Sequence, residues 1–465
     1  AGTPYTMDSG MTWPDNAERF TVFCRAIQAI AVNAASLDWQ PELVHCNDWQ
    51  TALVPPLLAG TADRPATVFT IHNLAYQGLF DWKIFKQLGL PADFWSMDAL
   101  EFHNQFSFIK GGLIFADWLT TVSPTYARES LTPAYGAGLD DALRARGDRY
   151  IGIINGIDTD LWDPSSDATL VAPYDGTDLA PKALTKTDLA QRNGLDPDGP
   201  LLGLIGRLDP QKGFDLVTQA APKLVEMAAR LIVLGTGHPQ LVAGLKELAA
   251  KHPDRIAVLE RFDRDEARRI YAGSDLFLMP SRFEPCGQGQ IIAMRYATPP
   301  VVRASGGLAD TVIDADEDPQ RGTGFVFEPA VGWHAGRAPG PGDLSMALAY
   351  AGLDARNMRG LPTADELLAL PASIGVDARA FLAARAPELT VDNVVRALER
   401  DTPGIYDVAV GLPYLSTSGP GGDLRVGPYG VDLRGLEKVG LPSLEPRDDT
   451  KLIVLDEIGK MELLS

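Results

Sequence analysis

Six short apolar runs, each followed by a turn or a stretch with helical spacing, constrain the fold of this chain more than any other feature. Between residues 201 and 327 the runs are LLGLIG, RLIVLG, RIAVLE, DLFLMP, PPVVRA and GFVF. One face of the first connecting stretch carries Val217, Ala220, Ala221, Leu224 and Ala228. Alternating strands and helices predict a doubly wound parallel sheet, whose ligand lies beyond the carboxyl ends of the strands.

A second block with the same rhythm precedes the first. Between residues 41 and 158 the strand-like runs ELVHCND and ATVFTIHN alternate with helical stretches such as FSFIKGGLIFADW. The two blocks predict an α/β protein with two Rossmann-like domains that face a cleft, the first over residues 1–162 and the second over residues 163–330. The chain begins with Ala1 and without a strand pattern, so we expect the first domain to be incomplete.

The character of the sequence changes after residue 330. A Gly- and Pro-rich linker is followed by helix-like pieces, so we expect residues 331–400 to form a linker and a helical segment, to which no role is assigned. Residues 401–465 are turn-rich and end in the strand-like KLIVLDEIGK. They are predicted to form a separate α/β fragment.

Composition excludes several classes of function. The chain has 41 Lys and Arg against 61 Asp and Glu, a formal net charge of −20, and an acidic surface repels nucleic acids and anionic lipids. The three cysteines include no CxxC pair, which predicts a reducing compartment. No apolar run reaches the ~18 residues needed to cross a bilayer. We therefore expect a cytoplasmic protein without nucleic-acid or membrane partners.

The string GRLDPQKG follows the first strand of the second block. Arg207 and Lys212 lie on a loop that leaves the carboxyl end of this strand and enters a helix. Both cations are therefore predicted to converge on one anion, such as a diphosphate. The alternative is a solvated loop with two ordinary surface cations.

The string SRFEPCGQGQIIAMRYA has the same strand–loop–helix organisation. Gly287 and Gly289 let the backbone approach a ligand, and the following helix directs its amide groups to the same place, which predicts a phosphate cradle without a P-loop. Glu284 beside an anion suggests contact with sugar hydroxyls. A surface ion pair with Arg282 or Arg303 is an equally weighted alternative.

Polar side chains also follow two strands of the first block, in VHCNDWQ and TIHNLAYQG. The expected lining of the opposite wall is His45, Asp48, His72 and Asn73. Trp49 and Tyr76 suit the face of a sugar, and core packing is their alternative. A metal site is a rival interpretation, although neither HxxxH nor HExxH spacing occurs.

Together these strings resemble one family, the bacterial glycogen synthases and plant starch synthases, which are retaining glucosyltransferases of the GT-B fold. The resemblance runs from about residue 12 to residue 329 through WPDNAERF, VHCNDWQ, TIHNLAYQGLF, FSFIKGG, TTVSPTYARE, IINGIDTDLWDP, GRLDPQKGFDL, SRFEPCG and GGLADTV. It implies transfer of glucose from ADP-glucose to the non-reducing 4-hydroxyl of an α-1,4-glucan, without a metal ion or other cofactor.

The resemblance also implies roles for individual residues. Arg207 and Lys212 would bind the diphosphate and stabilise the departing ADP, and Glu284 would be the essential carboxylate near the donor sugar. The backbone that would hold glucose hydroxyls and phosphate comprises Cys286, Gly287, Gln288, Gly289 and Gln290. Asp48 and His72 would line the glucose and acceptor side, and Asn155 in the NGID string would face the cleft.

The sequence departs from the family at several places. The amino-terminal Lys-x-Gly-Gly-Leu loop has no counterpart ahead of residue 12, the usual Leu-Thr-Gln is replaced by residues 288–290, and Phe262 stands where a Tyr is expected near the base. These departures leave open an inactive remnant that binds a glucan or a nucleotide.

The tail resembles a different family. RVGPYGVDL and LIVLDEIGKMELLS are similar to the second half of a small P-loop nucleoside-triphosphatase, with Asp456 and Glu457 as the acidic pair that would hold Mg²⁺. No GxxxxGK[ST] string occurs in the chain. A non-functional fragment is therefore expected, and nucleoside triphosphatase activity is the remaining alternative.

Overall fold

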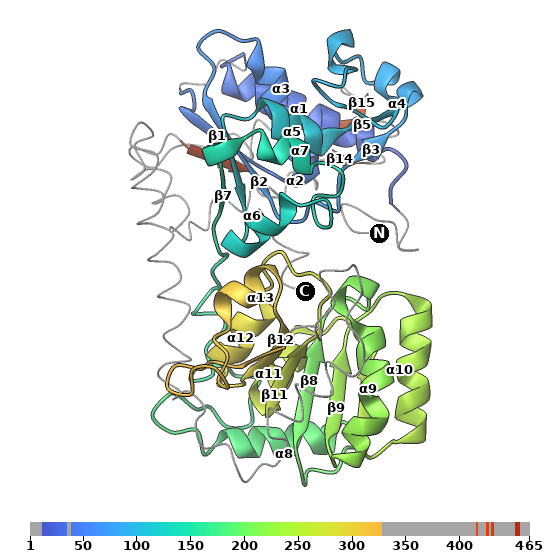
Figure 1. Cartoon of the computed structure of the whole chain (residues 1–465), viewed down its shortest axis with the longest axis vertical. Helices are drawn as coiled ribbons and strands as arrows, with labels where there is room; N and C mark the ends of the chain where they lie inside the picture. Colours follow the sequence, from blue (N-terminus) through green and yellow to red (C-terminus); the bar gives the residue numbers. More distant parts are fainter. Residues whose placement is uncertain are drawn as a thin grey trace. The chain divides into compact units, whose positions relative to one another are not determined.

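A computed structural model of the chain (Figure 1) describes residues 12–34 and 39–327, together with the backbone of four short strands between residues 415 and 455. The expected linker and helices of residues 331–400 lie outside the described residues. The described residues form two compact units. The first unit contains residues up to 121, residues 127–152 and the four late strands, and the second unit contains residues 122–126 and 153–327.

The first unit is built on a five-stranded parallel sheet with the order β17-β1-β2-β6-β7. Its strands are β1 (Leu43–Asn47), β2 (Ala66–Ile71), β6 (Trp118–Thr121), β7 (Tyr150–Gly152) and β17 (Leu452–Leu455). The first four pair in sequence order, as successive βα units do. β17 belongs to the tail and pairs in parallel with the edge of β1, with Leu43 opposite Leu452. The strand expected in KLIVL is therefore confirmed.

Helices and a small antiparallel sheet complete the first unit. The helices are α1 (Asn16–Ala31), α2 (Asp48–Thr51), α3 (Val54–Ala59), α4 (Trp82–Gln87), α5 (Phe108–Phe115), α7 (Asp140–Arg144) and the 3-10 turns Ala92–Phe94 and Gly147–Arg149. The small sheet has the order β3-β5-β4, from Leu79–Phe80, Gln105–Ser107 and Glu101–Phe102. In α1 the buried apolar residues Phe20, Cys24, Ile27 and Ala31 recur every three or four positions, so one face packs into the core. Three strands near the end of the chain form a separate antiparallel sheet: β14 (Leu415–Ser416), β15 (Arg425–Val426) and β16 (Tyr429–Val431).

The second unit contains a six-stranded parallel sheet with the order β10-β9-β8-β11-β12-β13. Its strands are β8 (Leu201–Ile205), β9 (Arg230–Leu234), β10 (Ile256–Leu259), β11 (Leu276–Met279), β12 (Pro300–Arg303) and β13 (Phe325–Phe327). All six strands expected from the apolar runs are confirmed. Numbered from β8, the order is 3-2-1-4-5-6, the arrangement of a doubly wound Rossmann sheet.

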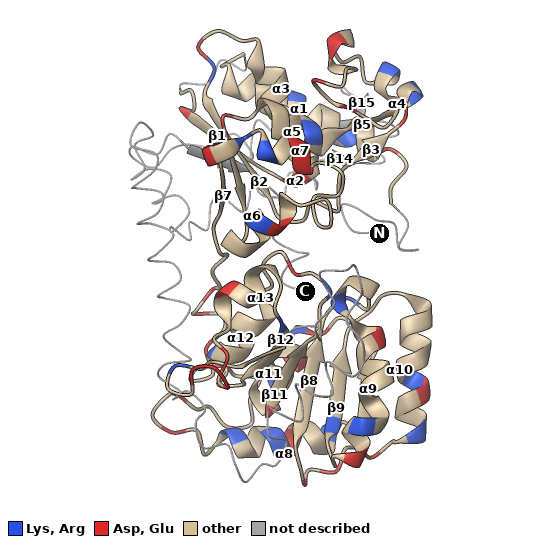
Figure 2. Ribbon diagram, in the orientation of Figure 1, with Lys and Arg blue, Asp and Glu red and all other residues tan. Residues whose placement is uncertain are grey.

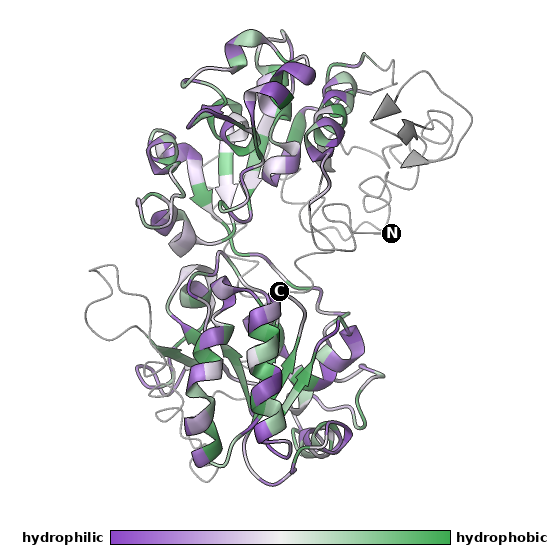
Figure 3. Ribbon diagram, turned by 90° about the vertical axis from the view of Figure 1, so that its right-hand side faces the viewer, coloured by the Kyte–Doolittle hydropathy of each residue, from purple (hydrophilic) through white to green (hydrophobic). Residues whose placement is uncertain are grey.

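Helices cover both faces of this sheet because its strands are apolar on both sides. The helices are α8 (Lys182–Arg192), α9 (Phe214–Glu226), α10 (Pro239–Lys251), α11 (Arg264–Gly273), α12 (Gly289–Arg295) and α13 (Gly306–Thr311), with a 3-10 turn at Pro210–Lys212. The remaining helix, α6 (Pro124–Ser130), is divided between the two units. Leu276 and Leu278 of β11 pack with α9 and α10, whereas Phe277 and Met279 pack with α12 and α13. Figure 3 shows these strands as hydrophobic and the outer helix faces as hydrophilic.

The end of α9 differs from the expected helical face. Ala228 was placed on that face by its spacing, but the helix ends at Glu226 and Ala228 lies in the following turn with a φ of 55°. The buried residue is instead Ala229, which is 3% exposed. The helical spacing in the sequence continues to Ala228, but the chain leaves the helix before that residue and turns toward β9.

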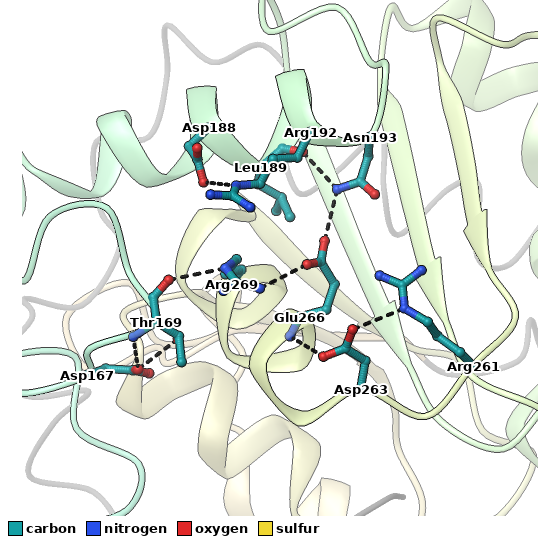
Figure 4. A network of polar contacts seen from close by, with 10 residues as sticks. All are labelled: Asp167, Thr169, Asp188, Leu189, Arg192, Asn193, Arg261, Asp263, Glu266 and Arg269. Carbon is teal, nitrogen blue, oxygen red and sulfur yellow. Dashed lines mark hydrogen bonds and ion pairs between the residues drawn. The ribbon is translucent and has the colours of Figure 1, made fainter.

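A polar network joins α8 to α11 on the second unit (Figure 4). The Asp263 carboxylate accepts a hydrogen bond from the Glu266 backbone N–H at 3.0 Å and so caps α11. The buried Glu266 carboxylate accepts hydrogen bonds from the Asn193 amide (2.9 Å) and the Arg269 guanidinium (3.2 Å). The network therefore fixes two helices against each other.

Charges elsewhere are interspersed rather than separated. Figure 2 shows both signs of charge on the helices of the second unit, including α9 and α10. In the part of the chain that the structure describes, no helix is long and apolar enough to cross a membrane.

Candidate active site

The order of the second sheet reverses between β8 and β11. These strands are neighbours, but the chain continues from β8 toward β9 on one side and from β11 toward β12 on the other. In doubly wound sheets the ligand crevice lies at the carboxyl ends of the strands at this switch point. The loop after β8 carries Arg207 and Lys212, and the loop after β11 carries Glu284. Strand order therefore brings the two basic residues and the carboxylate to the same edge.

Lys212 and Glu284 form a buried ion pair at this edge. The Lys212 Nζ donates hydrogen bonds to Glu284 Oε2 at 2.8 Å and to Oε1 at 3.0 Å, and their side chains are only 8% and 5% exposed. The Ser281 hydroxyl donates a third hydrogen bond, to Glu284 Oε2 at 2.9 Å. Lys212 is therefore not a solvated surface cation.

The alternative partners expected for Glu284 are wrong. Arg282 forms a two-pronged pair with Asp215, with both N–O distances at 2.7 Å. Arg303 lies inside β12 and is 1% exposed. Glu284 as a whole residue is 4% exposed, so its carboxylate is buried and does not belong to a surface ion pair.

Backbone contacts explain why the two loops meet. Gly213, with a φ of 71°, follows Lys212, and a Cβ there would lie 2.1 Å from the Pro280 carbonyl oxygen. The Arg282 backbone N–H donates to the Gln211 carbonyl at 2.7 Å, and the Gln211 side-chain amide donates to the Phe283 carbonyl at 3.2 Å. The loops are therefore held together along their length, and the ion pair follows from this backbone arrangement.

The start of α13 clamps the Glu284 loop from the other side. A Cβ on Gly306, whose φ is 47°, would lie 2.0 Å from the Glu284 carbonyl oxygen, and one on Gly307 would lie 2.2 Å from that of Cys286. The Gly307 N–H donates to the carbonyls of Glu284 and Pro285 at 3.1 and 3.0 Å. Sequence reasoning missed these positioning glycines, although the adjacent pair in GGLADTV was a signal for close backbone approach.

The segment Cys286 to Gln290 turns tightly into α12. Gly287 has a φ of 69°, and a Cβ there would lie 2.6 Å from the Gln290 side-chain oxygen. The Gln290 amide donates to the carbonyls of Cys286 (3.0 Å) and Gly287 (3.1 Å) and to Thr311 Oγ1 (3.0 Å). The Gln290 side chain therefore supports the loop from within. Gly289 is the first residue of α12 and is buried.

Three further expected residues lie around these loops. Arg207 is half-buried directly after Gly206, and Asn155 is half-buried in the segment after β7. The Gln288 side-chain amide donates to the carbonyl of Gly156 at 3.1 Å, next to Asn155. Phe262 follows β10 and is 54% exposed. Convergence of Arg207 and Lys212 on one anion stays a prediction, because the Lys212 ammonium is bonded to Glu284 here.

In the first unit Asp48 and His72 lie together. Asp48 Oδ1 accepts the His72 backbone N–H at 2.7 Å, and His72 Nε2 lies 3.0 Å from Asn47 Oδ1. Asp48 follows β1 with a φ of 52°, a conformation that a non-glycine residue rarely adopts. Asn47 was not singled out from the sequence, although it stands beside Asp48 in the HCND string.

His45 does not share that position. It lies within β1, and its Nε2 is 2.6 Å from Thr70 Oγ1, which in turn is 2.5 Å from Thr120 Oγ1. Burial, followed by the repulsion of His72, lowers the pKa of His45 to about 4. His45 is therefore held by a hydrogen bond to the neighbouring strand, and a place for it in a binding wall stays a prediction.

The other residues expected on the first wall have mixed surroundings. Trp49 packs against the rings of Phe20 and Phe108 with centroid distances of 4.9 and 5.6 Å, which favours core packing. Asn73 Oδ1 accepts the Ala75 N–H at 3.0 Å and so forms a turn. Tyr76 is 42% exposed. Contact of these residues with a sugar stays a prediction, and Asp456 and Glu457 of the tail lie outside the described residues.

Comparison with family models agrees with these features. The starch synthase catalytic domain family matches residues 1–145, and the glycosyl transferases group 1 family matches residues 185–335. An NTPase family matches residues 405–465, in agreement with the resemblance of the tail.

Individual relatives cover most of the described chain. Glycogen synthase 2 of Nitrosococcus oceani is 53% identical over 331 residues, which are 70% of this chain and 67% of that protein. The glycogen synthase of Halorhodospira halophila is 53% identical over 325 residues, 70% of this chain and 68% of that protein. The catalytic domain of starch synthase IV from Arabidopsis thaliana, solved with ADP and acarbose, is 31% identical with a TM-score of 0.69, covering 84% of this chain and 79% of that one.

These similarities confirm the expected GT-B arrangement of two Rossmann-like units and the expected enzyme class. They extend over both units, and the strand order of the second unit supports them independently. The chain belongs to the glycogen and starch synthase family of glycosyltransferases.

Proposed function

We propose that this chain transfers glucose from ADP-glucose to the non-reducing end of an α-1,4-glucan. The observation that carries the proposal is the buried Lys212–Glu284 pair at the switch point of a Rossmann sheet, in a chain related to glycogen synthases. The related starch synthase that was solved with ADP and acarbose supports a nucleotide sugar and a glucan as the two substrates.

On the donor side, Arg207 and Lys212 bind the diphosphate. Lys212 exchanges part of its contact with Glu284 for phosphate oxygens, because a doubly charged diphosphate competes for the ammonium group. The two cations then stabilise the charge that develops on the departing ADP. Glu284 accepts hydrogen bonds from glucose hydroxyls, and the backbone of residues 286–290, including Cys286, Gly287, Gln288, Gly289 and Gln290, holds phosphate and sugar.

On the acceptor side, Asp48 and His72 contact glucose and the incoming glucan hydroxyl, with Asn73, Asn155, Trp49 and Tyr76 as further contacts. Retention of configuration follows if the acceptor oxygen attacks the face from which ADP leaves. The C–O bond to ADP breaks, the new glycosidic bond forms, and the departing phosphate takes the acceptor's proton. No second protein nucleophile is required for this step.

The proposal is tested by ADP release from ADP-glucose in the presence of glycogen. Lys212→Ala and Glu284→Ala are each expected to lower turnover by at least about a hundredfold, since removing one group that stabilises transition-state charge costs ~2.7–4 kcal/mol. Lys223→Ala is the matched control, because Lys223 is exposed and pairs with Glu226 on α9.

Two other outcomes have distinct signatures. A folded chain that binds ADP but releases none from ADP-glucose is the inactive remnant, which contradicts the proposal. ATP hydrolysis that is lost in Asp456→Asn would instead assign the activity to the tail, where an NTPase family matches.

A further inference from the structure

Ser281 lies at the junction between β11 and the loop that carries Glu284. It is 2% exposed, and its hydroxyl donates to Glu284 Oε2 at 2.9 Å. Lys212 Nζ reaches the same oxygen at 2.8 Å and the other oxygen, Oε1, at 3.0 Å. Oε2 therefore accepts hydrogen bonds from a neutral donor, Ser281, and from a charged donor, Lys212. Among the described residues, the hydrogen bond to Oε1 comes from Lys212.

The two donors differ in what a bound donor substrate does to them. An ammonium group is attracted to a diphosphate, but a serine hydroxyl is neutral and has no such competing attraction. The backbone also holds Ser281 in place, because the next residue, Arg282, is hydrogen-bonded to Gln211 and paired with Asp215. The serine contact is thus the one that persists when Lys212 turns toward phosphate.

We propose that Ser281 is a positioning residue for glucosyl transfer: its hydroxyl holds the Glu284 carboxylate in place while Lys212 binds the diphosphate of the donor. This inference rests on the proposed function. With Oε2 held by Ser281, Oε1 is left to accept a hydrogen bond from a hydroxyl of the donor sugar. The serine itself touches neither substrate.

The experiment compares steady-state kinetics of the full chain with those of Ser281→Ala, Ser281→Cys and Ser281→Thr. Ser281→Ala removes the donor, and Ser281→Cys keeps a similar volume but donates weakly. Both are expected to lower kcat by roughly ten- to a hundredfold, the effect of one hydrogen bond to a charged group. KM for ADP-glucose and Kd for ADP should change less than about threefold, and Ser281→Thr, which restores a hydroxyl, should recover most of kcat.

Ser274→Ala is the matched control. Ser274 is also fully buried in the second unit, and its hydroxyl has no hydrogen-bond partner among the described residues. Its removal should leave kcat and the unfolding temperature close to those of the parent chain. A purely structural role for Ser281 would instead weaken ADP binding and lower the unfolding temperature along with kcat, and Ser281→Thr would not rescue kcat.

The outcomes separate the two proposals. Wild-type kcat in Ser281→Ala and Ser281→Cys would overturn the role of Ser281 alone, as would a parallel loss of kcat, ADP affinity and thermal stability. Absence of turnover in the parent chain would contradict both proposals. A selective loss of kcat with rescue by threonine supports the positioning role.

Discussion

At the scale of single residues, the Lys212–Glu284 pair has a proposed role in catalysis and also affects the free energy of unfolding. Both side chains are nearly inaccessible to water, so removing one leaves the other charge buried without its partner. We expect Lys212→Met to lower the free energy of unfolding by about 3–5 kcal/mol. The double variant Lys212→Met/Glu284→Gln should lose clearly less than the sum of the single variants, because the orphaned charge is gone. Urea denaturation measures this coupling, and strictly additive losses would contradict it.

His45 makes stability depend on pH. The pKa of His45 is about 4 in the folded chain, against 6.5 for an ordinary histidine. Between these two pH values the histidine is protonated in the unfolded state but mostly neutral in the folded state. Stability should therefore fall as the pH drops from 6.5 toward 4, by up to ~3 kcal/mol, and level off below that range.

The measurement for His45 is urea unfolding at several pH values between 7 and 5. His45→Gln removes the titrating ring but keeps a side chain that can hydrogen-bond to Thr70, so it should flatten the slope over this range. A variant with the same slope as the parent chain would show that other groups cause the pH dependence.

At the scale of elements, the sequence predicts where strands form better than it predicts which strands pair with one another. All six apolar runs of the second unit form strands because local composition determines them. Their order depends on pairing between distant segments, and only that order places the loops after β8 and β11 side by side. The role of the two loops as sites stays a prediction. The partner of Glu284 could not be predicted, since nothing local in the sequence shows that Arg282 pairs with Asp215. The bond from His45 to Thr70 was unpredictable for the same reason, because it joins two strands that are distant in the sequence.

The clamp formed by α13 gives a prediction at this scale. Gly306→Ala would place a methyl group 2.0 Å from the Glu284 carbonyl oxygen in a left-handed conformation. Gly194, with a φ of 69° and open space around it, provides the control for backbone conformation alone. Gly194→Ala should cost about 1 kcal/mol, and Gly306→Ala should cost more and also lower ADP release. Equal unfolding free energies and unchanged turnover would show that the clamp does not hold the loop.

At the scale of the whole molecule, the proposed chemistry is divided between two units. The Asp48–His72 contact belongs to the first and the Lys212–Glu284 pair to the second. The second unit could be anticipated from its repeated strands and helices. The contribution of the tail to the first unit could not be anticipated. The last segment matches an unrelated NTPase family, yet its strand β17 pairs with β1.

This strand pairing predicts that the tail stabilises the first sheet. β17 covers the edge of β1 along Leu43 to Cys46, and an uncovered strand edge is a template for association with another chain. Proline has no N–H to donate and disrupts a sheet ladder. In a full-length Ile453→Pro/Leu455→Pro variant, the amides of β1 should therefore exchange hydrogen faster, and light scattering should detect self-association.

The control for this variant is a proline pair at Leu415 and Ser416 of β14, in the separate three-stranded sheet that does not pair with β1. It should leave exchange in β1 unchanged, whereas protection of β1 that survives both proline pairs would show that the tail strand contributes nothing to the edge. The second sheet, which does not contain β17, provides an internal reference: its exchange should stay constant in both variants. A loss confined to β1 and its neighbours would then assign the tail a structural role in the synthase fold, independent of any nucleotide chemistry.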